Sequence, residues 1–313
     1  MYYIANMRED DRVIDHYFCK QKQSLKTNSG KTYLSLKLQD KTGLIDAKVW
    51  ELTNDIQAFE EGDVVKVDGS VLLYQNALQM KVLKLRRSRE GEYSPADLNP
   101  STDKDIDSLY AALKEKITGL KQPLRQLCED IYNSDLVNGS IRTHSAAKAM
   151  HHGYMGGLLE HTVSVTEICE FMAGRYKYVQ RDVLVAAALL HDIGKIQELS
   201  PFPQNDYTDD GELLGHIVIG AQMVHEAAAR IPNFPHELES LLTHAILAHH
   251  GQMEWGSPKQ PKTIEAFLLH CADDTDAKAK MFEDMVANYK GAGKWVGYNR
   301  PLERNIRKAD DAL

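Results

Sequence analysis

Hydrophobic residues recur with one period in the first part of the chain and with a different period in the rest. Up to about residue 90, apolar and polar side chains alternate, as at residues 33–38, where leucine takes every second position. This period of two is typical of half-buried antiparallel strands. Beyond residue 101 the spacing becomes three and four, as at Ile106, Leu109 and Leu113, which is typical of an amphipathic helix. Since the two periods bury different kinds of surface, we expect a β domain followed by an α domain.

The first part is expected to form a small barrel. Five strands are predicted, at residues 13–25, 33–38, 44–50, 63–67 and 78–82. Residues 40–43 read Asp-Lys-Thr-Gly, and Gly43 can adopt the positive φ that a hairpin turn requires. A short helix is predicted at residues 51–59, before the fourth strand. This count favours a five-stranded Greek-key barrel of the OB type.

The second part is expected to be a bundle of helices. Helices are predicted at residues 106–117, 157–173, 181–191, 213–230, 237–249 and 263–289, and Ser101 or Thr102 is expected to cap the first. Residues 88–101 are rich in Gly, Pro, Ser and charge, which is typical of a linker. The fold class is therefore α+β multidomain. We predict a barrel domain at 1–90, a linker and connecting helix at 91–130, an all-α domain at 131–290 and a basic-aromatic tail at 291–313.

Cysteine usage and hydropathy narrow the class of protein. The four cysteines, Cys19, Cys128, Cys169 and Cys271, lie far apart and form no CxxC pair, which argues against a disulfide framework or a thiolate zinc site. No apolar run reaches the length of about 18 residues that a spanning helix needs. The N-terminus lacks the basic flank and apolar stretch of a secretory signal. We expect a reduced, cytoplasmic protein without a membrane partner.

Charge is distributed unevenly between the two parts. The formal net charge of -8 would by itself argue against a nucleic-acid partner, because phosphates attract Lys and Arg. Residues 1–90, however, hold fifteen basic and thirteen acidic side chains, whereas the remainder holds 22 and 32. Histidine is also concentrated, since twelve of the 13 histidines lie between His144 and His270. Because histidine is the commonest metal ligand, the acidic second part is the place to look for a metal site.

Five short segments at the edges of apolar helical runs carry the candidate metal ligands. They contain His161, the pair His191 and Asp192, His216, the pair His249 and His250, and Asp273. Imidazole and carboxylate groups in such positions must be paired, hydrogen-bonded or bound to metal. Together they suit divalent ions such as Mn, Fe, Co, Ni or Zn. Since the ligands come from different helices, the ion is expected in the middle of the bundle.

The order His161, His191-Asp192, Asp273, with His-Asp-Ile-Gly-Lys at residues 191–195, resembles the HD-domain metal-dependent phosphohydrolases over about residues 140–285. The resemblance implies that these four residues form the basic metal set. It also implies a second ion, supplied by His216 and the pair His249 and His250, without deciding which of that pair is the direct ligand. Asp273 is preferred to Asp274 because it matches the family's A-D-x-x-D-A form. We expect two ions, with Mn first and Co, Fe, Ni or Mg as alternatives.

The arrangement of the whole chain is similar to that of the YhaM-type 3'→5' exoribonucleases, in which an OB barrel precedes an HD domain. The similarity rests on four stretches, at residues 40–50, 69–71, 151–162 and 249–258. It implies hydrolysis of phosphodiester bonds in single-stranded RNA, and also DNA, by metal-activated water. The alternatives are an HD-type nucleotide phosphohydrolase, a di-iron oxygenase on the same helical scaffold, and a nucleic-acid-binding scaffold with a degenerate metal site.

Two residue groups in the second part are candidates for catalysis and substrate binding besides the ligands. Asp192 is expected to be catalytic as well as metal-binding. Lys195 can offer its cation to a non-bridging phosphate oxygen, or it can simply lie favourably at a helix C-terminus. His151 and His152 precede the first ligand and can line the substrate entrance, donate to phosphate, or bond the loop backbone.

The barrel is expected to hold the nucleic acid. OB barrels bind single strands with a basic groove and aromatic stacking platforms. Tyr33, Lys37, Lys48 and Trp50 fall on the faces opposite the leucines and are the candidate binding residues. Alternatively, the two aromatic rings pack beneath a contact between domains. The tail can clasp nucleic acid or another subunit, and we expect a homo-oligomer.

Overall fold

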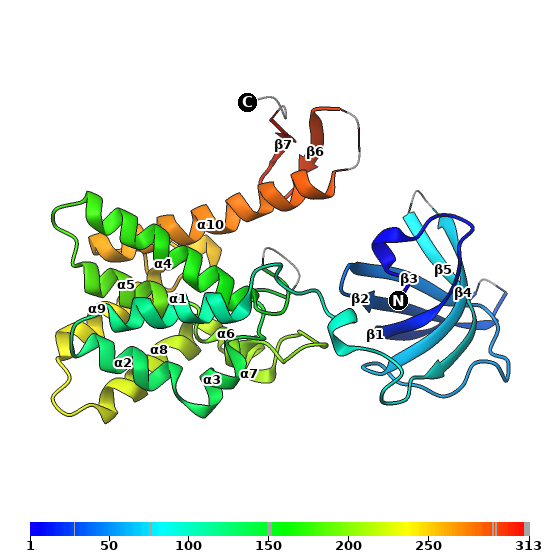
Figure 1. Cartoon of the computed structure of the whole chain (residues 1–313), viewed down its shortest axis with the longest axis horizontal. Coiled ribbons are helices and arrows are strands. Elements are labelled where there is room, and N and C mark those ends of the chain that lie inside the picture. The colour runs from blue at the N-terminus through cyan, green and yellow to red at the C-terminus, as the bar shows by residue number, and fades with distance from the viewer. Residues whose placement is uncertain (28, 75–76, 149–151, 290, 292, 310–313) are drawn as a thin grey trace. The chain divides into compact units, whose positions relative to one another are not determined.

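The computed structural model describes residues 1–313 except 28, 75–76, 149–151, 290, 292 and 310–313 (Figure 1). The chain divides into two compact units. One contains Met1–Ser101 with Pro201–Asn205, and the other contains Thr102–Ser200 with Asp206–Leu313. The change of hydrophobic period predicted near residue 90–101 therefore lies close to the border between the units. The limits that we predicted within this scheme, at residues 90, 130 and 290, stay predictions.

The first unit is a closed five-stranded barrel, as the alternating pattern predicted. Its strands follow the order β1-β2-β3-β5-β4, and every neighbouring pair is antiparallel except β3 and β5. They are β1 (Arg12–Lys26), β2 (Thr32–Asp40), β3 (Gly43–Val49), β4 (Val64–Tyr74) and β5 (Ala77–Arg87). Short 3-10 turns, η1 (Ile4–Asn6) and η2 (Pro95–Asp97), flank the barrel in sequence.

Alternation along β2 and β3 separates the inside of the barrel from its surface. Leu36 of β2 lies opposite Ala47 of β3, and both are buried in the core. One residue further along each strand, Lys37 is exposed and Lys48 is half-buried on the outer face. Each fully buried aliphatic side chain stabilises the fold by roughly 1.5–3 kcal/mol, so this register is strongly fixed.

The helix predicted at residues 51–59 is wrong. This segment contains turns and an isolated bridge, in which Ile56 pairs with Leu85 of β5 in parallel. The amide of Gln57 donates to the carbonyl of Leu85 at 2.8 Å, and the amide of Leu85 donates to the carbonyl of Asp55 at 3.0 Å. The segment therefore satisfies its backbone against β5 rather than within a helix, a tertiary effect that local pattern does not reveal.

The second unit is a helical bundle. The helices among its described residues are α1 (Ile106–Thr118), α2 (Leu124–Tyr132), α3 (Asp135–Ser140), α4 (Gly157–Arg175), α5 (Arg181–Leu190), α6 (Lys195–Glu198), α7 (Asp209–Leu213), α8 (Gly215–Arg230), α9 (His236–Ala248) and α10 (Ile264–Asn288). The six predicted helices correspond to α1, α4, α5, α8, α9 and α10. Among the described residues, no helix combines the length and the apolar character needed to cross a bilayer.

The centre of the bundle is α5. All eight residues 183–190 are buried, and α4, α9 and α10 pack against this helix. The residues that directly follow α5 therefore emerge in the interior of the unit and not at its surface. This placement explains how polar side chains at residues 191 and 192 become buried.

Two details of the second unit correct the sequence prediction. The N-cap of α1 is Asp105, whose carboxylate accepts from the Ser108 amide at 2.7 Å, and not Ser101 or Thr102. The hydroxyl of Thr102 instead donates to Glu160 at 2.6 Å. The sequence also predicted no strands beyond the barrel. After α10, however, β6 (Trp295–Asn299) and β7 (Arg304–Arg307) form an antiparallel hairpin (Figure 1).

Candidate metal centre

Five elements of the helical unit bring the predicted ligands together. His161 lies in α4, His191 and Asp192 follow α5, His216 lies at the start of α8, His249 and His250 follow α9, and Asp273 lies in α10. Four of these side chains are almost completely buried, namely His161, His191, Asp192 and His249. The structure therefore places every predicted metal ligand in one region of the bundle.

One glycine permits the close approach of two of these elements. Gly194 lies between α5 and α6, and a Cβ atom at this position would lie 2.1 Å from the backbone oxygen of His216. No larger residue fits without displacing α8. The glycine in the His-Asp-Ile-Gly-Lys segment thus lets His216 come close to Asp192.

Four side chains form the first ligand group. His161 Nε2 lies 3.1 Å from Asp273 Oδ1, 3.3 Å from His191 Nε2 and 3.4 Å from Asp192 Oδ2. Two imidazole nitrogens and two carboxylates thus point at one place. Bonds of about 2.0–2.2 Å to a shared ion would separate neighbouring ligand atoms by about 3.0–3.5 Å, so the donor set fits a divalent ion.

The second ligand group consists of His216, His249 and His250. Their ligand atoms lie within 4.8 Å of one another. Asp192 Oδ1 lies 3.5 Å from His216 Nε2 and 3.6 Å from His249 Nε2. One oxygen of Asp192 therefore faces the first group and the other faces the second, as a carboxylate shared by two ions would.

Three buried polar atoms in this region lack a hydrogen-bond partner in the part of the chain that the structure describes. They are Asp192 Oδ1, His216 Nε2 and His249 Nε2. Orphaned buried polar atoms are rare in native proteins, and each one needs an explanation. All three face the same point, and a bound cation would satisfy them together.

The other ring nitrogens of the histidines are held by hydrogen bonds. His191 Nδ1 donates to the Ala188 carbonyl at 2.7 Å, His249 Nδ1 donates to the Ile246 carbonyl at 2.7 Å, and His250 Nδ1 donates to the Trp255 carbonyl at 2.9 Å. Each bond fixes the tautomer, so that Nε2 keeps its lone pair for the centre.

Two carboxylates that the sequence prediction did not include hold the remaining rings. Glu198 Oε1 lies 2.8 Å from His216 Nδ1, and Asp276 Oδ2 lies 2.7 Å from His161 Nδ1. The position of Asp276, three residues after Asp273 on α10, was a usable signal because such residues share a helix face. No sequence pattern indicated the role of Glu198, because its contact with His216 of α8 depends on the tertiary fold.

Charge within the centre shifts the pKa values of its groups. Burial opposes ionisation of Asp192, but Lys195 and His191 hold the pKa of its carboxyl well below the ordinary value. Lys195 Nζ donates to Asp192 Oδ2 at 2.6 Å, and despite burial this contact raises the pKa of Lys195. Burial lowers the pKa of His249, His191 and His250. These three rings are therefore neutral at pH 7, as metal ligation requires.

His161 differs from the other histidines of the centre. Burial disfavours its protonation, but Asp192, Asp273 and Asp276 surround the ring and raise its pKa well above the ordinary value. Without an ion, the imidazolium of His161 balances part of the acidic charge. A divalent cation bound at the same point would take over this role and displace the proton.

Of the two histidines predicted to bind substrate, the structure describes only His152. His151 lies outside the described residues. His152 is buried, with a positive φ of 55°, and lies 3.0 Å from Asp276 Oδ2 through Nε2 and 3.0 Å from the Tyr154 hydroxyl through Nδ1. It thus shares Asp276 with His161, next to the first ligand group. Substrate contact by His152 stays a prediction.

On the barrel, Tyr33 and Lys37 lie on the outer face of β2 and Lys48 on that of β3, and Trp50 directly follows β3. The rings of Tyr33 and Trp50 stack with centroids 4.7 Å apart and an interplanar angle of 25°. Lys48 Nζ donates to Ser35 Oγ at 2.5 Å beside them, and Lys37 is exposed. Two stacked aromatic rings and two lysines thus form one surface, which we call the aromatic-lysine face.

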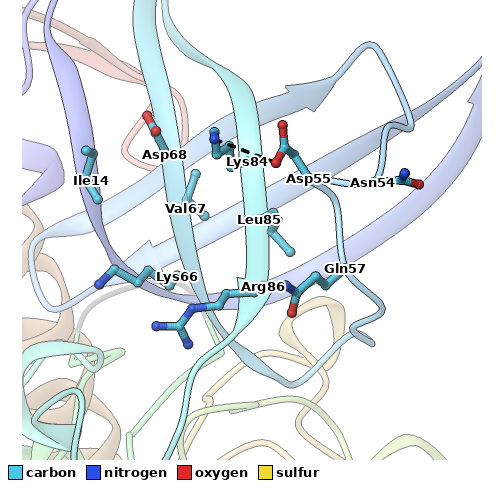
Figure 2. A pocket seen from close by; sticks show the side chains of 10 residues that line it. All are labelled: Ile14, Asn54, Asp55, Gln57, Lys66, Val67, Asp68, Lys84, Leu85 and Arg86. Carbon is cyan, nitrogen blue, oxygen red and sulfur yellow. Dashed lines mark ion pairs between the residues drawn. The ribbon is translucent and has the colours of Figure 1, made fainter.

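A pocket of about 280 Å³ lies elsewhere on the barrel, along β1, β4 and β5 (Figure 2). Lys84 pairs with Asp55 at 3.7 Å in this pocket, and Arg86 pairs with Glu92 at 2.8 Å. The charges of these two cations are therefore compensated within the first unit. None of the residues predicted to bind metal or substrate lines this pocket.

Comparison with known proteins gives matches for both units and for most of the chain. The family model of the HD domain matches residues 158–278, and that of the OB-fold nucleic acid binding domain matches residues 20–87. The 3'-5' exoribonuclease YhaM of Geobacillus sp. (strain WCH70) is 34% identical over 265 residues, which cover 84% of this chain and 81% of that protein.

A solved structure, the second OB-fold domain of replication protein A from Methanococcus maripaludis determined by solution NMR, is 21% identical to this chain. The aligned part covers 29% of this chain and 96% of that domain, with a TM-score of 0.24. A score this low carries no argument beyond what the barrel topology already shows.

Proposed function

The chain belongs to the family of the 3'-5' exoribonuclease YhaM, and we propose that it removes nucleotides from the 3' end of single-stranded RNA by metal-dependent hydrolysis. The observation that carries this proposal is the position of Asp192. Its two oxygens face two separate groups of imidazoles, and one oxygen and two facing nitrogens are buried without hydrogen-bond partners. This arrangement supports a centre for two divalent ions, the arrangement found in many enzymes that cleave phosphodiesters.

We propose that His161, His191, Asp192 and Asp273 hold one ion and that Asp192, His216, His249 and His250 hold the other. Divalent ions there would neutralise phosphate charge and supply an activated water for in-line attack. Mixed imidazole and carboxylate ligands support Mn as the first choice, with Co, Fe, Ni or Mg as alternatives. Asp276 and Glu198 orient the rings of His161 and His216.

Lys195 is proposed to serve both the centre and the substrate. Its ammonium holds one oxygen of Asp192, and its side chain is 13% exposed, so that part of it remains accessible at the edge of the centre. From this position we propose that it also contacts a non-bridging phosphate oxygen. Such a contact would add a fixed positive charge where negative charge develops.

The barrel is proposed to bind the RNA strand through the aromatic-lysine face. Base stacking on an aromatic ring contributes about 1–3 kcal/mol per base and tolerates any sequence. Lys37 and Lys48 lie beside the rings and suit the phosphates between stacked bases. This role accounts for the less acidic composition of the first part of the chain. Binding of DNA and the expected homo-oligomer stay predictions.

The experiment starts from the metal-stripped full chain and 5'-labelled single-stranded RNA, with Mn, Co, Mg or Fe added in turn. We expect a ladder of products that shortens from the 3' end in at least one metal. Asp192→Asn, which keeps the shape of the side chain, is the control and should give no ladder. Absence of cleavage in every metal, together with turnover of mononucleotides, would instead favour an HD-type nucleotide phosphohydrolase.

A further inference from the structure

An exposed tryptophan is hydrogen-bonded through its backbone to one of the candidate metal ligands. Trp255 lies in the 3-10 turn η3 (Met253–Trp255), which follows His249 and His250. Its carbonyl accepts the hydrogen bond from His250 Nδ1 at 2.9 Å, yet 55% of the residue is exposed to solvent. The residue that holds a candidate ligand thus also presents a large ring to solvent.

The neighbours of the Trp255 ring place it against the face of α10 that carries His270 and Lys278. The ring centroid is 6.0 Å from that of His270, and Lys278 Nζ lies 5.7 Å from the Trp255 ring centroid. His270 and Lys278 are eight residues apart on α10 and share one face of that helix with Asp274. Asp273 is the residue before Asp274, about 100° around the helix. The ring therefore lies along the edge of the centre formed by α10.

The turn that carries Trp255 is fixed in place. Gly251 has a φ of +79°, and a Cβ atom there would lie 2.4 Å from the His270 ring, so only glycine fits. The hydroxyl of Ser257 lies 2.9 Å from the carbonyl oxygen of Leu247 and 2.7 Å from that of Lys259, and it donates its one hydrogen between them. The backbone position of Trp255 is thus set before any ligand arrives, which reduces the entropy lost on binding.

We propose that Trp255 is a stacking platform for the base that flanks the scissile phosphodiester, and that Lys278 binds the adjoining phosphate. This inference rests on the proposed exoribonuclease function. An aromatic face that is open to solvent and lies beside a cation is the combination that binds single-stranded nucleic acid. Lys278 now pairs with Asp274 at 2.7 Å, but both side chains are exposed and such a pair is weak. A phosphate can therefore replace Asp274 as its partner.

The test measures the first cleavage of a short 5'-labelled oligo(A) strand under single turnover, with the Mn-loaded full chain in excess. Trp255→Ala should raise the half-saturating protein concentration about tenfold, as expected for the loss of one stacked base, and should leave the maximal rate within about twofold. Trp255→Phe should recover most of the affinity. Met253→Ala is the matched control, because Met253 is an exposed residue of the same turn without a ring.

A second substrate separates stacking from a structural effect on His250. On a strand whose two 3'-terminal nucleotides lack bases, wild type and Trp255→Ala should bind equally well, and both should retain equal metal content. Equal loss on both substrates, a loss of bound metal in Trp255→Ala, or a change of less than twofold on the normal strand would overturn the inference. If wild type itself does not cleave RNA, the proposed function fails. If wild type cleaves and Trp255→Ala behaves like it, only the stacking role fails.

Discussion

Among the described residues, each unit buries one aspartate almost completely, Asp40 in the first and Asp192 in the second, and the two differ in what surrounds them. Asp40, at the end of β2, accepts from the Ile4 amide at 2.6 Å and from the Thr42 amide and hydroxyl at 2.7 and 2.6 Å. Asp192, after α5, has one oxygen bonded to Lys195 and the other without a hydrogen bond. A buried carboxylate with complete hydrogen bonds stabilises a turn, whereas an incomplete one marks a place for a ligand.

The two units also differ in where their candidate binding residues lie. The barrel keeps its charged and aromatic binding candidates on the outside, where Tyr33 and Trp50 stack and Lys37 is exposed. The helical unit keeps its candidates inside, around the buried end of α5. A surface site can lose one contact and remain functional, whereas a buried metal centre depends on each ligand. Variants in the two units should therefore differ in both the kind and the size of their effects.

The largest effect is expected for Asp192→Asn. Loss of a carboxylate that faces both ligand groups should lower kcat by more than about 100-fold, since changes to residues that merely support ligands already cost 10–100-fold. Asp40→Asn is the matched control. It should leave kcat unchanged and lower the free energy of unfolding by about 1–3 kcal/mol, because the amide cannot accept all three hydrogen bonds. Equal kcat losses in the two variants would contradict the comparison of the aspartates.

Asp276→Asn should have the next largest effect, acting on metal affinity. Asp276 holds the ring of His161, and removing its charge should weaken Mn binding by about 10–100-fold. Asp274→Asn serves as control, because Asp274 lies two residues before it on α10 but is exposed and pairs with Lys278. Both variants can be titrated with Mn by calorimetry. Similar affinities for the two would show that Asp276 does not support the centre.

Metal binding should release a proton at neutral pH. The raised pKa of His161 means that the metal-free centre holds this proton above pH 6.5, and an ion must displace it. Asp192 and Asp273, whose pKa values are lowered despite burial, are already ionised and release none. Mn affinity should therefore rise by about tenfold per pH unit above 6.5, up to the raised pKa of His161.

The direction of the change in Mn affinity with pH is set by the proton on His161, which also stabilises the metal-free protein. A group with a raised pKa in the folded protein stabilises the metal-free fold below pH 6.5, and this contribution is lost as the pH rises through the raised value. Calorimetric titrations in two buffers with different ionisation enthalpies count the released protons. A Mn affinity that stays constant above pH 6.5 would show that His161 is neutral in the metal-free protein.

How far the sequence predicts this molecule depends on whether a feature is local. The alternation in β2 and β3 and the spacing in α1 are local patterns, and all three elements formed where predicted. The predicted ligands from His161 to Asp273 could be named because each stands at the edge of an apolar run and because their order resembles that of the HD-domain phosphohydrolases. The structure brings them together through the packing of α4, α8, α9 and α10 around the end of α5.

Features that depend on contacts between distant segments could not be predicted. Residues 51–59 pair with β5 instead of forming a helix, and no property of that segment alone indicates the partner. Glu198 supports His216 only because α6 lies against α8. Trp255 looks like an ordinary loop residue until its carbonyl is seen to hold His250. In each case the decisive group lies far along the chain or acts through its backbone.

In the proposed function, the helical unit cleaves the strand while the barrel holds it. The most direct test compares wild type with the double variant Tyr33→Ala, Trp50→Ala on two substrates, a long single-stranded RNA and a dinucleotide. A dinucleotide has a single phosphodiester bond and no further bases to stack on the barrel. Tyr74→Ala, which removes an exposed ring from β4, is the control.

For the double variant, kcat/KM should fall about tenfold on the long strand, through KM, as the loss of stacking predicts. Cleavage of the dinucleotide should stay within about twofold of wild type. An equal loss on both substrates, or no loss on the long strand, would contradict the division of roles between the barrel and the metal centre.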